Sequence, residues 1–198
     1  MSSSVTSSVL SSVCRVTMSN ISSVRRQSSS SVKRAGIIVI GDEILKGQTQ
    51  DTNTHFLTQR LFQRGVKVDR VSVIPDDIQT IASEVRAFAD KYDFVLTSGG
   101  IGPTHDDVTF EAVAQAFHCP VEHNETLVSM CKAWFKKDNL NDPCFKLSLI
   151  PSSAKLNFGI DKVTNKPMLY PLVSVENVFI FPGQNILPSQ PSINLQYI

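Results

Sequence analysis

Apolar and polar positions along the chain form blocks that predict strands and helices in alternation. The continuous apolar run at 36–40, Gly-Ile-Ile-Val-Ile, is typical of a strand covered on both faces in a parallel sheet. Further strands are expected at 66–74, 94–96, 147–150, 172–175 and 178–181. We expect the last three to form a mixed edge of the sheet or a hairpin.

Between these strands, apolar residues recur with helical spacing. A helix from about Thr54 should end at Gly65 and place four large residues inward: Phe56, Leu57, Leu61 and Phe62. A second helix follows Pro75-Asp76-Asp77, a third runs from about 108 to 117, and a fourth opens at Asn124. In this fourth helix the residues expected to be buried are Leu127, Met130, Trp134 and Phe135. The alternation predicts an α/β fold: a single-domain, three-layer α/β/α sandwich with a mostly parallel sheet.

Composition divides the chain into three segments. Residues 1–34 are rich in serine, contain five basic residues and have no Asp or Glu. This composition is typical of a mitochondrial transit peptide and predicts the mitochondrial matrix as location; a disordered leader on a cytosolic protein is the alternative. Residues 35–183 carry the α/β pattern, and 184–198 predict an irregular tail.

Charge and cysteine content exclude several function classes. Without the five basic residues of the leader, 14 of the 19 Lys and Arg residues remain against 18 Asp and Glu, a net charge of −4. An acidic body gives no support for nucleic-acid binding. No apolar run approaches the ~20 residues needed to span a bilayer. The four cysteines lack metal-ligand spacing, which argues against a zinc site, and no Gly-Lys-Ser/Thr P-loop motif is present.

The segment 96–109, Leu-Thr-Ser-Gly-Gly-Ile-Gly-Pro-Thr-His-Asp-Asp-Val-Thr, carries the clearest chemical signal. A buried strand ends in three glycines within four residues, and a helix starts soon after. Glycine lets backbone approach a ligand closely, and the amides at a helix start favour anions. The segment therefore predicts a phosphate-binding loop made by Ser98, Gly99, Gly100, Gly102, Pro103 and Thr104.

Acidic pairs follow three of the predicted strands, at Asp42-Glu43, Asp76-Asp77 and Asp106-Asp107. The carboxyl ends of parallel strands share one edge of a sheet, so these pairs should converge there. Adjacent carboxylates at a glycine loop suggest a hard cation such as Mg²⁺, with Asp42, Glu43, Asp106 and Asp107 as its ligands. Helix capping explains Asp51 and Asp77 more simply. Supporting roles are expected for Asp51, Asn53, His105 and Glu111.

Several of these motifs together resemble one known family. Ser98–Thr104 followed by Asp106–Thr109 is similar to the signature of the MoaB/Mog-like, molybdopterin-binding domain. With Gly41–Gly47 and Gln50–Asn53, the chain resembles the variant found in the N-terminal domain of eukaryotic FAD synthase and in bacterial CinA proteins. The stretches 107–113, 146–154 and 171–175 favour FAD synthase, and the resemblance covers about 35–183.

This resemblance implies a three-layer fold whose ligand pocket lies at the glycine loop, with Asp76 and Asp107 as the functional aspartates. It implies metal-dependent hydrolysis of FAD to FMN and AMP, with Mg²⁺, Mn²⁺ or Co²⁺ and with K⁺ as a further cation. In FAD synthases, FMN adenylylation resides in a separate C-terminal domain that these 198 residues do not contain. We therefore expect no FAD synthesis by this chain alone.

Two alternatives to hydrolysis stay open. One is a non-catalytic flavin- or nucleotide-binding module that regulates or pairs with full-length FAD synthase. The other is molybdopterin binding in molybdenum cofactor biosynthesis, although Thr104-His105-Asp106 is less basic than the loop of molybdopterin-handling members. Stand-alone members of the family are often trimeric, so we expect a homo-oligomer, either a trimer or a dimer.

Overall fold

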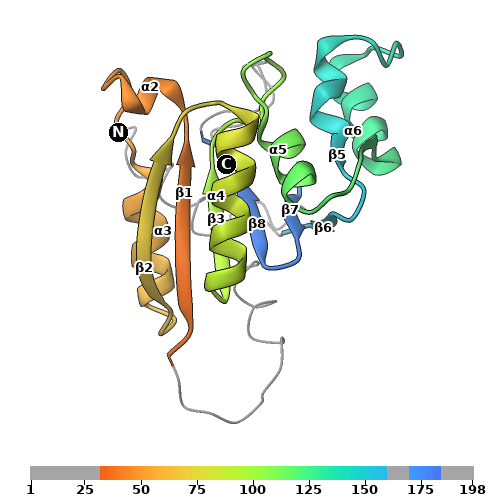
Figure 1. The fold of residues 1–198 in the computed structure, drawn as a ribbon. Helices are drawn as coiled ribbons and strands as arrows, with labels where there is room; N and C mark the ends of the chain where they lie inside the picture. Colours follow the sequence, from red (N-terminus) through yellow and green to blue (C-terminus); the bar gives the residue numbers. More distant parts are fainter. Residues whose placement is uncertain (1–31, 160–169, 184–198) are drawn as a thin grey trace, which may run out of the picture.

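A six-stranded sheet forms the centre of the computed structural model, which describes residues 32–159 and 170–183. In spatial order the strands are β2 (Lys67–Ile74), β1 (Arg34–Ile40), β3 (Phe94–Ser98), β8 (Val178–Phe181), β7 (Leu172–Val175) and β6 (Lys155–Asn157). The first four are parallel, and β7 and β6 continue the sheet in antiparallel pairing (Figure 1). The predicted mostly parallel sheet, with a mixed edge and a hairpin near its end, is confirmed.

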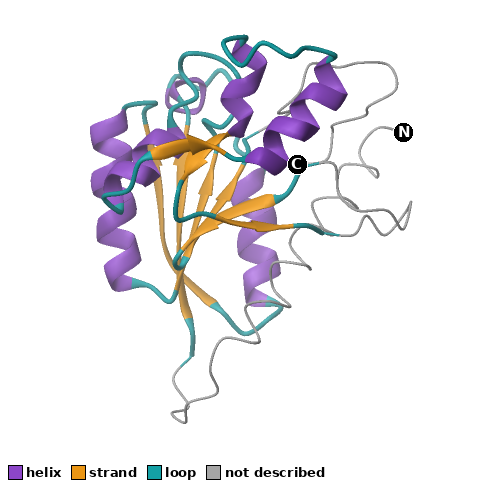
Figure 2. Cartoon of the chain, turned by 90° about the vertical axis from the view of Figure 1, so that its right-hand side faces the viewer, coloured by secondary structure: helices purple, strands orange, loops and turns teal. Residues whose placement is uncertain are grey.

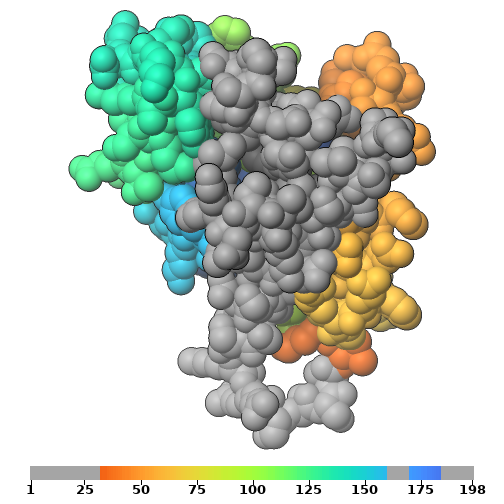
Figure 3. Space-filling view, turned by 180° about the vertical axis from the view of Figure 1, so that it is seen from behind, coloured from red at the N-terminus to blue at the C-terminus, as the bar shows by residue number. Residues whose placement is uncertain are grey.

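Helices cover both faces of this sheet, as expected for three layers (Figure 2). The remaining elements are α2 (Asp42–Leu45), α3 (Asn53–Phe62), α4 (Ile78–Lys91), α5 (Thr109–Ala116), α6 (Glu125–Phe135), η1 (Pro143–Ser148) and a small antiparallel pair, β4 (Val121–His123) with β5 (Leu149–Pro151). Seen from the opposite side in Figure 3, the segment of α2 and the segment of α6 lie at opposite flanks of the molecule.

Strand β1 explains why 36–40 is apolar without interruption. Ile38 and Ile40 lie in the core cluster formed with α4, α5 and α6, whereas Ile37 and Val39 lie in the cluster formed with α3. Successive side chains of a strand point to opposite faces, and both faces here are buried. The glycine loop that follows β3 is thus anchored beside a strand that is inaccessible on both sides.

Two sequence predictions about helical and strand positions are wrong. Phe62 is 79% exposed, because the core position at the end of α3 is taken by its neighbour Leu61, which is fully buried. The strand expected at 147–150 is short: Leu147 belongs to the 3₁₀ helix η1, and only Leu149–Pro151 pair, with β4 rather than the main sheet. The side chain of Asp142 starts η1 by accepting a hydrogen bond from the amide of Cys144, 3.3 Å away.

The predicted division into leader, domain and tail stays a prediction. β1 begins at Arg34, where the predicted leader ends. Residues 1–31 of that leader and the predicted tail at 184–198 lie outside the described residues. In the described ranges, none of the helices has the length and apolar character needed to cross a membrane.

Candidate functional site

Three segments that follow parallel strands meet at the carboxyl edge of the sheet. They are α2 after β1, the turn at 75–77 after β2, and the glycine loop, defined as residues 99–108, after β3 (Figure 1). Together they line a cleft of about 670 Å³. Its lining residues are Ile40, Asp42, Glu43, Lys46, Gln48, Pro75, Asp76, Asp77, Gly100, Thr104, Asp106 and Asp107. The acidic pairs predicted to converge are therefore neighbours in space.

Asp76 occupies the inner part of this cleft. Its Oδ2 accepts a hydrogen bond from the backbone amide of Asp42, 2.8 Å away, which connects the ends of β1 and β2. Partial burial raises the pKa of the Asp76 carboxyl; the hydrogen bond from Asp42 opposes this, and the nearby charges of Glu43, Asp42 and Asp107 raise the pKa further. Asp76 is thus a carboxylate held among other carboxylates, an arrangement that favours binding of a cation or a proton.

Asp107 closes the glycine loop on itself. Its Oδ2 accepts hydrogen bonds from the amide and the hydroxyl of Thr104, at 2.9 and 2.5 Å. A Cβ atom at Gly102 would lie 2.6 Å from the same Oδ2, so a side chain at that position would displace the carboxylate. Glycine at 102 is therefore needed for the position of Asp107.

Gly99 and Gly100 bring the loop against the neighbouring strand. Both have positive φ, 116° and 64°, and a Cβ at Gly99 would overlap the carbonyl oxygen of Ile40. A Cβ at Gly100 would overlap Thr109 Oγ1 and lie 3.4 Å from Asp76 Oδ1. Thr109 ties this turn to the start of α5, because its hydroxyl donates to the carbonyl of Gly99 and its amide to that of Gly100, both at 2.9 Å.

Some backbone amides of the glycine loop already donate a hydrogen bond within the protein, and others do not. The amide of Gly99 donates to the carbonyl of Phe181 at 3.1 Å, and the amide of Thr104 donates to Asp107. For the amides of Gly100, Ile101 and Gly102 there is no hydrogen-bond acceptor among the described residues. These three amides are available donors in the predicted phosphate-binding loop, whose role stays a prediction.

Some predicted site residues lie outside the cleft and have a structural role. Asn53 Nδ2 donates to the Ser98 hydroxyl at 2.9 Å and to the Gly183 carbonyl at 2.6 Å, which holds the Phe-Pro-Gly segment 181–183 beside Gly99. Asp51 accepts a hydrogen bond from the amide of Thr54 at 3.0 Å, next to the start of α3. In the structure these three side chains hold neighbouring segments in place, and the predicted ligand role of Ser98 and supporting roles of Asp51 and Asn53 stay predictions.

The capping interpretation of Asp77 agrees with the structure. Asp77 is the N-cap of α4, and its carboxylate accepts the amide of Thr80 at 2.8 Å. Hydrogen bonds from the hydroxyl and the amide of Thr80 hold the pKa of Asp77 below its ordinary value. Asp77 also lines the cleft, so it adds negative charge there.

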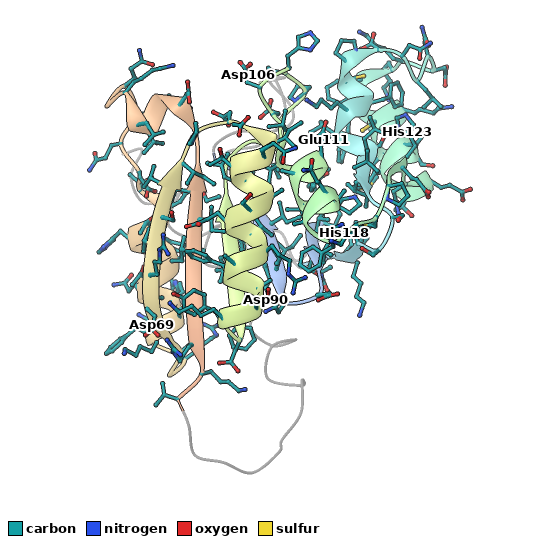
Figure 4. The ribbon with its side chains drawn as sticks, in the orientation of Figure 1. Asp69, Asp90, Asp106, Glu111, His118 and His123 are labelled. Carbon is teal, nitrogen blue, oxygen red and sulfur yellow. The ribbon has the colours of Figure 1, made fainter. Side chains whose placement is uncertain are left out.

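Three further predicted residues lie on or below the loop without lining the cleft. His105 and Pro103 are part of the loop surface, and Glu111 lies in the first turn of α5, below Asp106 in Figure 4. Lys146, which was not predicted, donates from Nζ to the carbonyl of Thr104 at 2.8 Å and lies 3.7 Å from Glu111. Glu111 therefore acts on the loop through Lys146.

Sequence reasoning also missed two polar residues that line the cleft, Lys46 and Gln48. The signal for Lys46 was its position four residues after Asp42, a spacing that places both on one face of a short helix. Nothing in the local pattern distinguishes Gln48 from a surface residue.

The donor set of the cleft consists of carboxylates, the ligands that Mg²⁺ prefers. Yet within 32–159 and 170–183 no group of three His, Cys, Asp or Glu side chains is arranged to hold a metal ion. Among the described residues the cleft therefore offers a metal ion fewer than three side-chain ligands, so water or a substrate must complete its coordination. The cleft fits Mg²⁺ held by one or two carboxylates together with the phosphate oxygens of a substrate, the usual arrangement for this ion.

Comparison with known proteins gives concordant matches. The family described as "Probable molybdopterin binding domain" matches residues 36–186. A "Probable FAD synthase" of Caenorhabditis elegans is 39% identical over 166 residues, which is 76% of this chain and 32% of that protein. The crystal structure of a CinA protein "with unknown function" from Thermoplasma acidophilum has a TM-score of 0.66 and 32% identity, covering 77% of this chain and 89% of the other. The chain thus spans about a third of the worm FAD synthase that it matches.

Proposed function

The chain belongs to the family of probable molybdopterin-binding domains, and within it we propose that this protein hydrolyses FAD to FMN and AMP with a divalent cation. The similarity to about a third of a probable FAD synthase supports a role in flavin metabolism, as does the resemblance of 41–47 and 107–113 to FAD synthases. The observation that carries the proposal is the cleft itself, which is lined by six carboxylates and by Gly100 of the glycine loop.

A phosphoryl-transfer site needs donors for the phosphate oxygens and ligands for a divalent ion, and the glycine loop and the carboxylates would supply them. The amides of 100–102 would bind the oxygens of the pyrophosphate, as amides at glycine turns do. Glu43 and Asp107 would hold the divalent ion together with those oxygens. When bound, such an ion polarises a phosphoryl oxygen and lowers the pKa of an attacking water.

Asp76 is placed to take the proton of that water. Its Oδ2 is fixed by the amide of Asp42, whereas its Oδ1 lies beside Gly100, where the pyrophosphate would bind. Water adds to one phosphorus, the bond from this phosphorus to the bridging oxygen breaks, and the proton passes to Asp76. The products are FMN and AMP, so atoms and charge balance without a further reactant.

The test is incubation of the full chain with FAD and Mg²⁺, Mn²⁺ or Co²⁺, with chromatographic detection of FMN and AMP. We expect equal amounts of both products. In Asp107→Asn the rate should fall by a factor of about 100 or more, since we propose that this carboxylate binds the ion as well as the glycine loop. Asp90→Asn is the matched control, because Asp90 lies at the opposite end of the sheet (Figure 4).

An Asp107→Asn protein with an undiminished rate would contradict the assignment. Tight FAD binding without product would favour the alternative of a non-catalytic flavin- or nucleotide-binding module. Binding of molybdopterin in preference to FAD would favour the third possibility, which the description of the family supports.

A further inference from the structure

The cleft carries an unusual balance of charge for a site that would bind an anion. Six of its lining residues are carboxylates, and Lys46 is the one basic residue among those that line it. Pyrophosphate is itself an anion, and the carboxylates repel it unless cations compensate them. The partner of the Lys46 ammonium group therefore affects how tightly the cleft can bind pyrophosphate.

Lys46 lies at the end of α2, whose backbone is well fixed. The amide of Gly41 donates to Ile74 at 3.1 Å, and the amide of Gln48 donates to the carbonyl of Glu43 at 2.9 Å. The Lys46 side chain, by contrast, is 59% exposed, and its Nζ lies 2.7 Å from Asp42 Oδ2. The backbone of Lys46 is thus held in place, while its long side chain is solvated and free to change its partner within the cleft.

The present partner of Lys46 holds it weakly. An exposed carboxylate–lysine pair four residues apart on a helix contributes little free energy, because water screens it and both side chains lose freedom. The hydrogen bond to Asp42 and the charge of that carboxylate, followed by the charges of Asp106 and Asp76, raise the pKa of the Lys46 ammonium group. A phosphoryl group, with its higher charge and several acceptor oxygens, is the better partner.

We propose that Lys46 exchanges partners: it neutralises Asp42 in the nucleotide-free cleft and binds a phosphoryl oxygen of the substrate when pyrophosphate enters. This inference rests on the proposed function and assigns Lys46 as a substrate-binding residue. In the empty cleft the positive charge of Lys46 also disfavours a divalent cation at the neighbouring carboxylates Glu43 and Asp107. The exchange therefore couples release of Asp42 to the arrival of the nucleotide.

The test uses two binding titrations of the full chain, neither of which depends on turnover. Mn²⁺ alone is titrated by electron paramagnetic resonance, and inorganic pyrophosphate with Mg²⁺ by calorimetry. The variants are Lys46→Met and Lys46→Arg, and the matched control is Lys132→Met, which removes an exposed lysine of α6 that is paired with Asp138.

Lys46→Met should bind Mn²⁺ alone about threefold more tightly, since one screened positive charge is lost near the carboxylates. It should bind pyrophosphate about tenfold more weakly, the loss expected for one charge-assisted hydrogen bond. Lys46→Arg should restore pyrophosphate binding, and Lys132→Met should change neither affinity.

Opposite effects on the two ligands are the decisive result, because a local structural defect would weaken both. Lys46→Met with unchanged pyrophosphate affinity, or with weaker Mn²⁺ binding, would overturn the proposal. If the wild-type protein binds pyrophosphate but leaves FAD intact, the proposed hydrolysis fails and the exchange by Lys46 is still decided by these titrations.

Discussion

At the scale of single residues, the cleft is built for binding at the expense of stability. Asp76 is partly buried beside Glu43, Asp42 and Asp107, and burial and these charges raise its pKa. A carboxyl group whose pKa is higher in the folded than in the unfolded state stabilises the fold when protonated, and this stabilisation is lost as the pH rises through the folded-state pKa. At neutral pH, therefore, ionised Asp76 costs stability.

We accordingly predict that Asp76→Asn raises the melting temperature at pH 7 while abolishing FAD hydrolysis. Asparagine removes the charge but keeps an oxygen that can accept the amide of Asp42. The gain should disappear as the pH falls below the folded-state pKa of Asp76, because both side chains are then neutral. Thermal unfolding at several pH values checks this; a variant less stable than wild type at pH 7 would contradict it.

At the scale of elements, α3 shows how far periodicity determines a helix. Its inward positions Leu57 and Leu61 are buried as predicted, whereas Phe62 extends into solvent. The last turn of α3 contains two adjacent large apolar residues, Leu61 and Phe62. Only one of them can face the sheet, because neighbouring residues of a helix point about 100° apart. Which of the two does so depends on how α3 docks on β1 and β2.

This difference gives a stability prediction. Leu61→Ala should lower the free energy of unfolding by about 2–5 kcal/mol, the cost of a core cavity. Phe62→Ala should change it by no more than about 0.5 kcal/mol, as exposed substitutions usually do. Urea unfolding of both variants measures this directly. Equal losses would mean that Phe62 is covered in the protein in solution.

At the scale of the whole molecule, the residues that form the core and the carboxylates of the cleft occupy different places. Two apolar clusters, one on each face of the sheet, hold the layers together, while the carboxylates gather at one edge. No preformed metal site stands among the described residues. The protein should therefore fold without a metal ion, and only nucleotide binding and hydrolysis should need one.

We predict that a chelator abolishes FAD hydrolysis. It should change the melting temperature of the nucleotide-free protein by no more than about 2 °C, because metal binding does not contribute to the stability of the fold. Circular dichroism melts with and without chelator, together with the product assay, make the comparison. A large drop in melting temperature would show that a metal is part of the folded structure.

The sequence by itself determined the long strands and helices and the start of the glycine loop, because these depend on the local order of apolar, glycine and capping residues. Residues 36–40 as a doubly buried strand and Asp77 as a cap belong to this class. The sequence did not predict the short elements α2, η1, β4 and β6. Only the tertiary structure decided which side chains share the cleft. It joined Asp76 to Asp42 and added Lys46 to the cleft. It also placed Asn53 so that its Nδ2 donates to the Ser98 hydroxyl and to the Gly183 carbonyl. Such choices depend on the face on which each side chain leaves its strand or loop and on neighbours far away in sequence, which no local pattern encodes.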